Sequence, residues 1–207
     1  MKSRNFPFDR LLFNCMFGMV LPILCFIIGW WGSLIFTHTE KIIMLAAFSG
    51  LGFGILTSIT MRLIWRFDIY QLSVPILIMI YLFYNIGMFG FFMGVPVFHP
   101  VFGVIAGYYW AKRLIVQNRS INYSTDMNQI SGFTTLVLGL VCLCSAIFAL
   151  SSKSTPLDLK MMFHLPFDIS LQVLIIFIIG GGLLLIITQY WLTKITIIKT
   201  LEINHKI

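Results

Sequence analysis

The chain has 207 residues, of which 59% are hydrophobic and 10% are charged. An ordinary soluble domain is about 45–50% apolar and about 25% charged, so this composition excludes a soluble globular fold, which could not keep that much apolar surface from water. The net charge of +7 does not indicate nucleic-acid binding, because no basic face interleaved with aromatic residues lies outside the hydrophobic segments.

The apolar runs are continuous rather than alternating, as in the segment from Leu171 to Leu192. In lipid the backbone must satisfy its own hydrogen bonds, which leaves helices or a closed barrel, and barrel strands alternate with a period of two. The sequence therefore predicts an all-α integral membrane protein. Its predicted partner is the lipid bilayer in which it is embedded. At roughly 20 residues per crossing, it predicts a single transmembrane domain over 1–207, a bundle of about six helices spanning about 11–31, 42–61, 72–93, 98–111, 132–150 and 171–192.

The first predicted span is longer than the apolar core of a signal peptide, and no small-residue cleavage site follows Trp31. We therefore expect no cleaved signal peptide. The second predicted span carries a stripe of small residues, Ala46, Gly50 and Gly54, which permits close approach of another helix. Packing inside the chain is the favoured interpretation, and a partner membrane subunit or a homo-oligomer is the alternative.

The segment between Asp68 and Lys112 contains no Asp, Glu, Lys or Arg. As one helix it would be about 64 Å long, roughly twice the hydrocarbon thickness, so it must turn. Gly94, Pro96 and Pro100 mark the turn, since glycine permits unusual dihedral angles and proline disfavours helix before it. A full crossing by residues 98–111 is predicted, and a re-entrant segment over 94–111 is the alternative.

This uncharged pair of spans holds the polar positions of interest. Asn85 lies near the middle of a span, with Tyr81 one turn before it on the same helix face. The amide could bridge helices or line a polar cavity at midplane. His99 lies in the turn, where it could cap the next helix or contribute to a site. A second small-residue stripe, Gly103 and Gly107, follows.

Four further titratable residues are expected on the outer side, namely His38, Glu40, His164 and Asp168. Imidazoles and carboxylates at one surface can bind a metal such as zinc or act as general acid and base. Their spacing matches no ligand pattern, and solvated loop residues are the favoured interpretation. The three glycines Gly180–Gly182 in the last span indicate either close packing or a hinge.

Basic residues gather on cytoplasmic loops of membrane proteins. With a cytoplasmic N-terminus, 11 of the 14 Lys and Arg residues fall on the inner side, which leaves only Lys41, Lys153 and Lys160 outside. This bias predicts that both termini are cytoplasmic. The expected location is the cytoplasmic membrane of a prokaryote.

No ionisable residue lies in the middle of a predicted span, which argues against a proton-coupled antiporter. No hydrolase, metalloprotease or nucleotide-binding motif is present, no cofactor is indicated, and an enzyme is not the favoured class. The sequence favours a small-solute transport or membrane substrate-binding component without ion-coupling charges of its own. A non-catalytic assembly or interaction subunit is the alternative. A membrane enzyme using the outer-face histidines and carboxylates ranks third.

Overall fold

The structure is a computed structural model that describes residues 7–64, 69–91, 94–117, 123–152, 154–162, 164, 166 and 168–205. These residues form α-helices and two short 3-10 helices, and no strand occurs among them. Within the described ranges, four helical segments are long and apolar enough to cross a membrane: Phe13–Phe36, Glu40–Met61, Thr125–Ser151 and Leu171–Ile203. The prediction of an all-helical chain is confirmed, and the four apolar helices indicate a membrane-embedded protein.

The chain divides into two compact units, Met1–Ile80 and Tyr81–Ile207. The boundary falls inside helix α3 (Val74–Phe91), whose first turns belong to the first unit and whose remainder belongs to the second. The single transmembrane domain stays a prediction.

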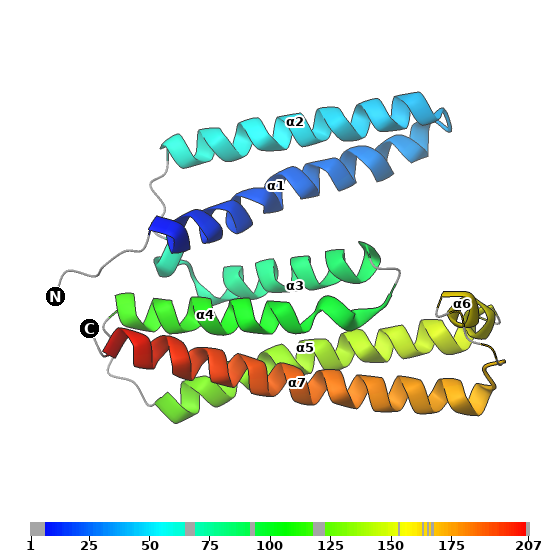
Figure 1. Ribbon diagram of the computed structural model, residues 1–207. Coiled ribbons are helices and arrows are strands. Elements are labelled where there is room, and N and C mark those ends of the chain that lie inside the picture. Colours follow the sequence, from blue (N-terminus) through cyan, green and yellow to red (C-terminus); the bar gives the residue numbers. More distant parts are fainter. Residues whose placement is uncertain are drawn as a thin grey trace. The chain divides into compact units, whose positions relative to one another are not determined.

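The first unit is built on an antiparallel hairpin of α1 (Pro7–Phe36) and α2 (Glu40–Ile64) (Figure 1). The backbones of the two helices lie close together because α2 presents small residues to α1. A Cβ added to Gly50 would lie 2.4 Å from the Cys25 carbonyl oxygen, and one added to Gly54 would lie 2.6 Å from the Pro22 Cα. The stripe predicted from Ala46, Gly50 and Gly54 thus lies within the hairpin.

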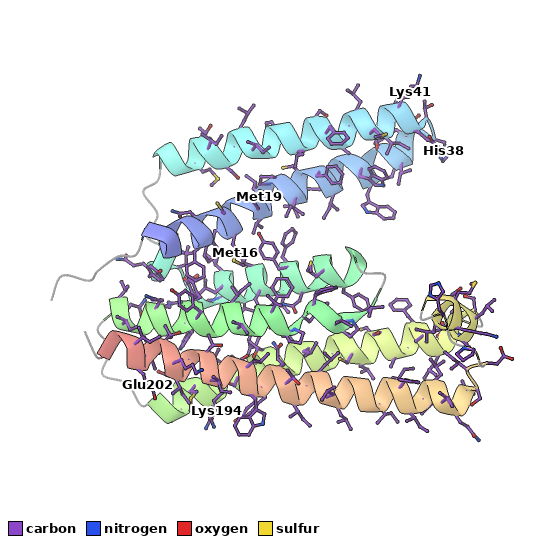
Figure 2. All side chains as sticks on the ribbon, viewed as in Figure 1. Met16, Met19, His38, Lys41, Lys194 and Glu202 are labelled. Atoms are coloured by element: carbon purple, nitrogen blue, oxygen red, sulfur yellow. The ribbon has the colours of Figure 1, made fainter. Side chains whose placement is uncertain are left out.

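At one end of this hairpin the Ser58 hydroxyl donates a 2.9 Å hydrogen bond to the Gly18 carbonyl oxygen. At the other end a short turn carries His38, and α2 begins directly after it with Glu40 and Lys41 (Figure 2). The positive end of the helix dipole stabilises the Glu40 carboxylate in the first turn of α2. Outward side chains are apolar, as in Phe36 at 88% exposed, which suits a surface in contact with lipid.

The second unit begins with the remainder of α3 and turns through η2 (Pro96–Phe98) into α4 (Pro100–Val116). Gly94 adopts φ +83°, a conformation that glycine reaches without strain, and Pro100 starts α4 where its missing N–H is harmless. The predicted turn is therefore confirmed. It separates α3, with 18 residues, from α4, with 17.

Three helices form the body of the second unit: α4, α5 (Tyr123–Ser151) and α7 (Leu171–His205), with short α6 (Thr155–Met162) between the last two (Figure 1). Helices α4 and α7 run parallel, since Gly103 meets Gln189 whereas Gly107 meets Ile197. Helices α5 and α7 run antiparallel. Near the cytoplasmic ends predicted above, an apolar core joins all three helices through Ala111, Ile115, Met127, Ile130, Ile197 and Leu201.

Helix α7 is a single unbroken element through Gly180–Gly182. Its 35 residues correspond to about 52 Å, well beyond a hydrocarbon core of about 30 Å. The excess lies at the C-terminal end, where Figure 2 shows Lys194 and Glu202. Helix α5 likewise begins at Tyr123, before the predicted span near 132. Hydropathy marks the apolar part of a helix and misses such polar extensions.

Candidate functional site

A group of polar side chains is buried where the second unit's helices meet. We call it the polar cluster. Two members lie on α3, one precedes α4, three lie on α5 and two lie on α7. Six of the eight are no more than 1% exposed, and Tyr81 and Thr135 are half-buried. The members are Tyr81, Asn85, His99, Ser131, Thr134, Thr135, Gln189 and Thr193.

The α3 side of the cluster is organised by Asn85. Its Nδ2 donates a 2.8 Å hydrogen bond to the Tyr81 carbonyl oxygen one turn earlier, as expected for residues at i and i+4. The His99 ring crosses the turn, and its Nε2 lies 3.1 Å from the Asn85 carbonyl oxygen. His99 occupies the position before α4 but forms no side-chain capping bond. The hydrogen bond of the Asn85 amide therefore stays within α3 and does not connect α3 to another helix.

The α5 and α7 side is organised by Gln189. Its Nε2 lies 3.2 Å from the Tyr81 hydroxyl, to which it donates, and 3.5 Å from the Thr134 carbonyl oxygen. One amide group thereby connects α3, α5 and α7. The hydroxyls of Thr134 and Thr193 lie 3.3 Å apart and join α5 to α7 a second time.

Aromatic rings flank the cluster. The Tyr81 ring centroid lies 5.5 Å from that of Phe133, and the His99 ring meets Phe102 edge-on at 6.1 Å. Phe102 also stacks on Tyr84 at 6.2 Å. The polar atoms are therefore enclosed by apolar surface, where water cannot easily replace a missing hydrogen bond.

Several atoms of this enclosed cluster have no hydrogen-bond partner. They are Asn85 Oδ1, His99 Nδ1, Gln189 Oε1, Ser131 Oγ and Thr135 Oγ1. More than nine in ten buried polar groups in folded proteins are paired. An unpaired one costs about 1–3 kcal/mol. Five such atoms therefore lie together in the polar cluster.

The second small-residue stripe brings α4 against this cluster. A Cβ on Gly103 would lie 2.6 Å from both Gln189 Nε2 and Thr193 Oγ1. A Cβ on Gly107 would lie 2.8 Å from the Thr193 backbone carbonyl oxygen. Glycine at both positions is therefore a requirement of the α4–α7 contact.

These distances predict a graded series of alanine variants. Gly103→Ala should lower the unfolding midpoint, because the Gln189 amide and the Thr193 hydroxyl must both move, although both belong to side chains and not to the backbone. Gly107→Ala should lower it more, because a backbone carbonyl must shift. Gly132→Ala is the control, since no neighbouring atom lies within 4 Å of that position. Thermal unfolding in detergent measures the series, and equal midpoints for all three variants would contradict this packing.

The predicted outer-face residues are divided between the two units. His38 and Glu40 belong to the first unit, and His164 and Asp168 belong to the second, so the four share no defined geometry. Asp168 forms an ion pair with Lys160 on α6, and this hydrogen bond lowers the pKa of the exposed carboxyl below its ordinary value. His164 is exposed at φ 50°. Among the described residues, no group of three His, Cys, Asp or Glu could hold a metal ion.

Sequence reasoning found Tyr81, Asn85 and His99 but missed the α5 and α7 members of the cluster. A signal was available: Ser131 and Thr134 are three apart, and Gln189 and Thr193 are four apart, in otherwise apolar helices. Such spacings place polar residues on one helix face. Hydroxyl groups in membrane helices usually bond their own backbone, so this pattern alone does not distinguish a site from ordinary packing.

No protein-family model, curated protein or solved structure matches the chain. A fold does not by itself define a function, which has to be argued from the residues of the site. The polar cluster is the strongest candidate in the described parts of the chain, because its residues are buried, contiguous and incompletely paired.

Proposed function

We propose that the chain is a multi-pass membrane protein that transports or binds a small solute at the polar cluster. The unpaired atoms of Asn85, His99 and Gln189 carry this proposal. Together with two unpaired hydroxyls they represent several kcal/mol of uncompensated desolvation at about 1–3 kcal/mol each. A solute that pairs with them in the bound state recovers that energy, which is how a polar site becomes a binding site.

We further propose six crossings with both termini in the cytoplasm. Under this topology α3 and α4 point in opposite directions, α4 and α7 point in the same direction, and α5 opposes α7. The observed packing has these directions. Helices α3 and α4 correspond to about 27 Å and 26 Å, close to the hydrocarbon thickness of about 30 Å, so the alternating arrangement is sterically reasonable for full crossings.

Cysteine-accessibility mapping in intact cells tests this topology. Single cysteines introduced at 62–66, 112–119 and the C-terminal end should all react only with a reagent that enters the cytoplasm. Cysteines near Lys41 and Lys160 should react from outside. If residues 62–66 and 112–119 reacted from opposite sides, the six-crossing topology would be wrong.

The polar cluster contains no carboxylate, lysine or arginine. Carriers that couple to protons or ions usually place such a residue within the membrane. A transport function at this cluster is therefore passive or is energised by a partner subunit. A binding component that delivers its solute to a partner fits the same observation.

A ligand-dependent shift of the unfolding midpoint tests the proposed function. Purified protein is screened against a library of small solutes, with Gln189→Met as the site variant and Gln129→Met as the matched control at an exposed position. A solute that stabilises the wild type and the Gln129 variant but not the Gln189 variant is expected. Binding stabilises a protein by about 2.7 kcal/mol when the ligand is at 100 times its Kd.

One observation favours a second candidate, a non-catalytic assembly subunit. Gly180 and Gly181 lie on α7 with no atom within 4 Å of an added Cβ, so small residues face outward on an apolar helix. Such residues allow another membrane helix to approach closely. Purification in mild detergent distinguishes the two: a stoichiometric partner subunit or a homo-oligomer lost in Gly181→Leu, without any solute response, favours assembly.

A further inference from the structure

We infer that the solute recognised by the polar cluster is a small neutral molecule that donates at least two hydrogen bonds through N–H or O–H groups. This inference rests on the proposed function and adds the chemical class of the ligand. It follows from whether each unpaired atom is a hydrogen-bond donor or an acceptor. The hydrogen bonds that the same side chains already make determine this.

The two amides are oriented by backbone carbonyls. A carbonyl oxygen only accepts hydrogen bonds, so the amide atom 2.8 Å from the Tyr81 carbonyl oxygen must be the Asn85 nitrogen. The same reasoning applies to Gln189, whose Nε2 faces the Thr134 carbonyl oxygen at 3.5 Å. The unpaired atoms Asn85 Oδ1 and Gln189 Oε1 are therefore acceptors.

The His99 tautomer is fixed in the same way. Nε2 lies 3.1 Å from the Asn85 carbonyl oxygen, so Nε2 carries the proton. In a neutral imidazole the other nitrogen is then an acceptor. His99 Nδ1 is buried without a partner and is the third unpaired acceptor of the cluster.

These three atoms cannot satisfy one another, because none has a proton to give. The remaining unpaired atoms, Ser131 Oγ and Thr135 Oγ1, are hydroxyls that can donate or accept. A ligand that offers only acceptors would leave Asn85, His99 and Gln189 unpaired. A ligand with several donors, such as a primary amide, a urea or a polyol, offers the protons that these acceptors lack.

A cation could also be attracted by acceptors, and the surroundings argue against it. No acidic residue belongs to the polar cluster, and the apolar rings of Phe102 and Phe133 flank it. A charge held among apolar groups without a counter-charge loses far more hydration than three neutral acceptors return. A neutral donor avoids this cost.

The test compares compounds in pairs that differ only in their donors. Acetamide is paired with N,N-dimethylacetamide, urea with tetramethylurea and glycerol with its trimethyl ether. Guanidinium and methylammonium serve as charged donors. The unfolding midpoint is measured at millimolar ligand for the full-length wild type, Asn85→Leu and Gln189→Met, with Gln129→Met as the control variant.

The expected result is that at least one donor compound raises the midpoint, that its methylated partner does not, and that both site variants lose the effect. A shift caused equally by a methylated partner, or only by a cation, would overturn the donor assignment while the solute-binding function stands. If no compound causes a shift that depends on Asn85 and Gln189, both the assignment and the proposed function fall.

A spectroscopic measurement examines His99 directly. In protein labelled with ¹⁵N-histidine, the signal removed by His99→Gln should show a protonated Nε2 and a bare Nδ1 at neutral pH. Addition of the stabilising donor should shift the Nδ1 resonance, because that nitrogen then accepts a hydrogen bond. A proton already present on Nδ1 in the free protein would contradict the inference, whichever compounds bind.

Discussion

Replacing Asn85 by leucine is expected to stabilise the unliganded protein by about 1 kcal/mol, and to abolish its response to the solute. Asn85 is 1% exposed, and its Oδ1 has no partner. The replacement removes the hydrogen bond from the Asn85 amide to the Tyr81 carbonyl oxygen. That oxygen can still accept the backbone hydrogen bond of the helix. An apolar side chain of similar size removes an unpaired acceptor without opening a cavity. That result would support a role for Asn85 in binding the solute, because the amide would then not be needed for stability.

The measurement is equilibrium unfolding in mixed micelles, with and without the stabilising compound. Gln129→Leu is the control, because it replaces an amide by leucine at an exposed position on α5 and should leave both the stability and the solute response unchanged. A loss of more than about 1 kcal/mol in Asn85→Leu would show that the amide serves structure instead. The cluster would then be internal packing.

Replacing Gly50 by alanine is expected to lower the free energy of unfolding by about 1–3 kcal/mol, the usual range for an overpacked contact. The added methyl would lie 2.4 Å from the Cys25 carbonyl oxygen, which is backbone and cannot rotate away. The two helices of the hairpin must separate. Gly52→Ala is the matched control two positions along α2, where an added Cβ meets nothing within 4 Å.

The chain supplies its own reporter for this comparison. Cys25, whose backbone carbonyl faces Gly50, carries a free, half-buried thiol. In a variant that retains only this cysteine, a thiol-reactive dye should label Gly50→Ala faster and at lower temperature than the parent. Gly52→Ala should behave like the parent or be slightly more stable, because alanine favours helix over glycine. Equal labelling of the two variants would mean that α1 and α2 do not pack through this stripe.

The sequence predicted helical elements well because continuous apolar runs leave the backbone no other way to satisfy its hydrogen bonds in lipid. The turn at Gly94 and Pro100 was equally predictable, since both residues restrict the backbone locally. The start of α5 was less predictable. Helix α5 begins at Tyr123, ahead of the predicted span near 132, because Met127 and Ile130 pack against the core formed by Ala111, Ile197 and Leu201.

Part of the candidate site could likewise be predicted from local sequence, and part could not. Asn85 and His99 could be singled out because each is a polar residue in an uncharged segment. Gln189 and Thr193 could not be joined to them from sequence, because the contact depends on α4 and α7 lying parallel at glycine distance. The partners Gln189 and Tyr81 are 108 positions apart. Only tertiary packing brings them together.

The parallel pairing of α4 with α7 also dictates when the site can exist during biosynthesis. A ribosome delivers α3, α4 and α5 to the membrane before Gln189 and Thr193 have been translated. Until then, the Tyr81 hydroxyl has no Gln189 amide to pair with, and the face of Gly103 is open to lipid or to a membrane chaperone. Truncation anywhere before Gln189 therefore removes the hydrogen bonds that join α3, α5 and α7 in the cluster, and leaves those within 81–99.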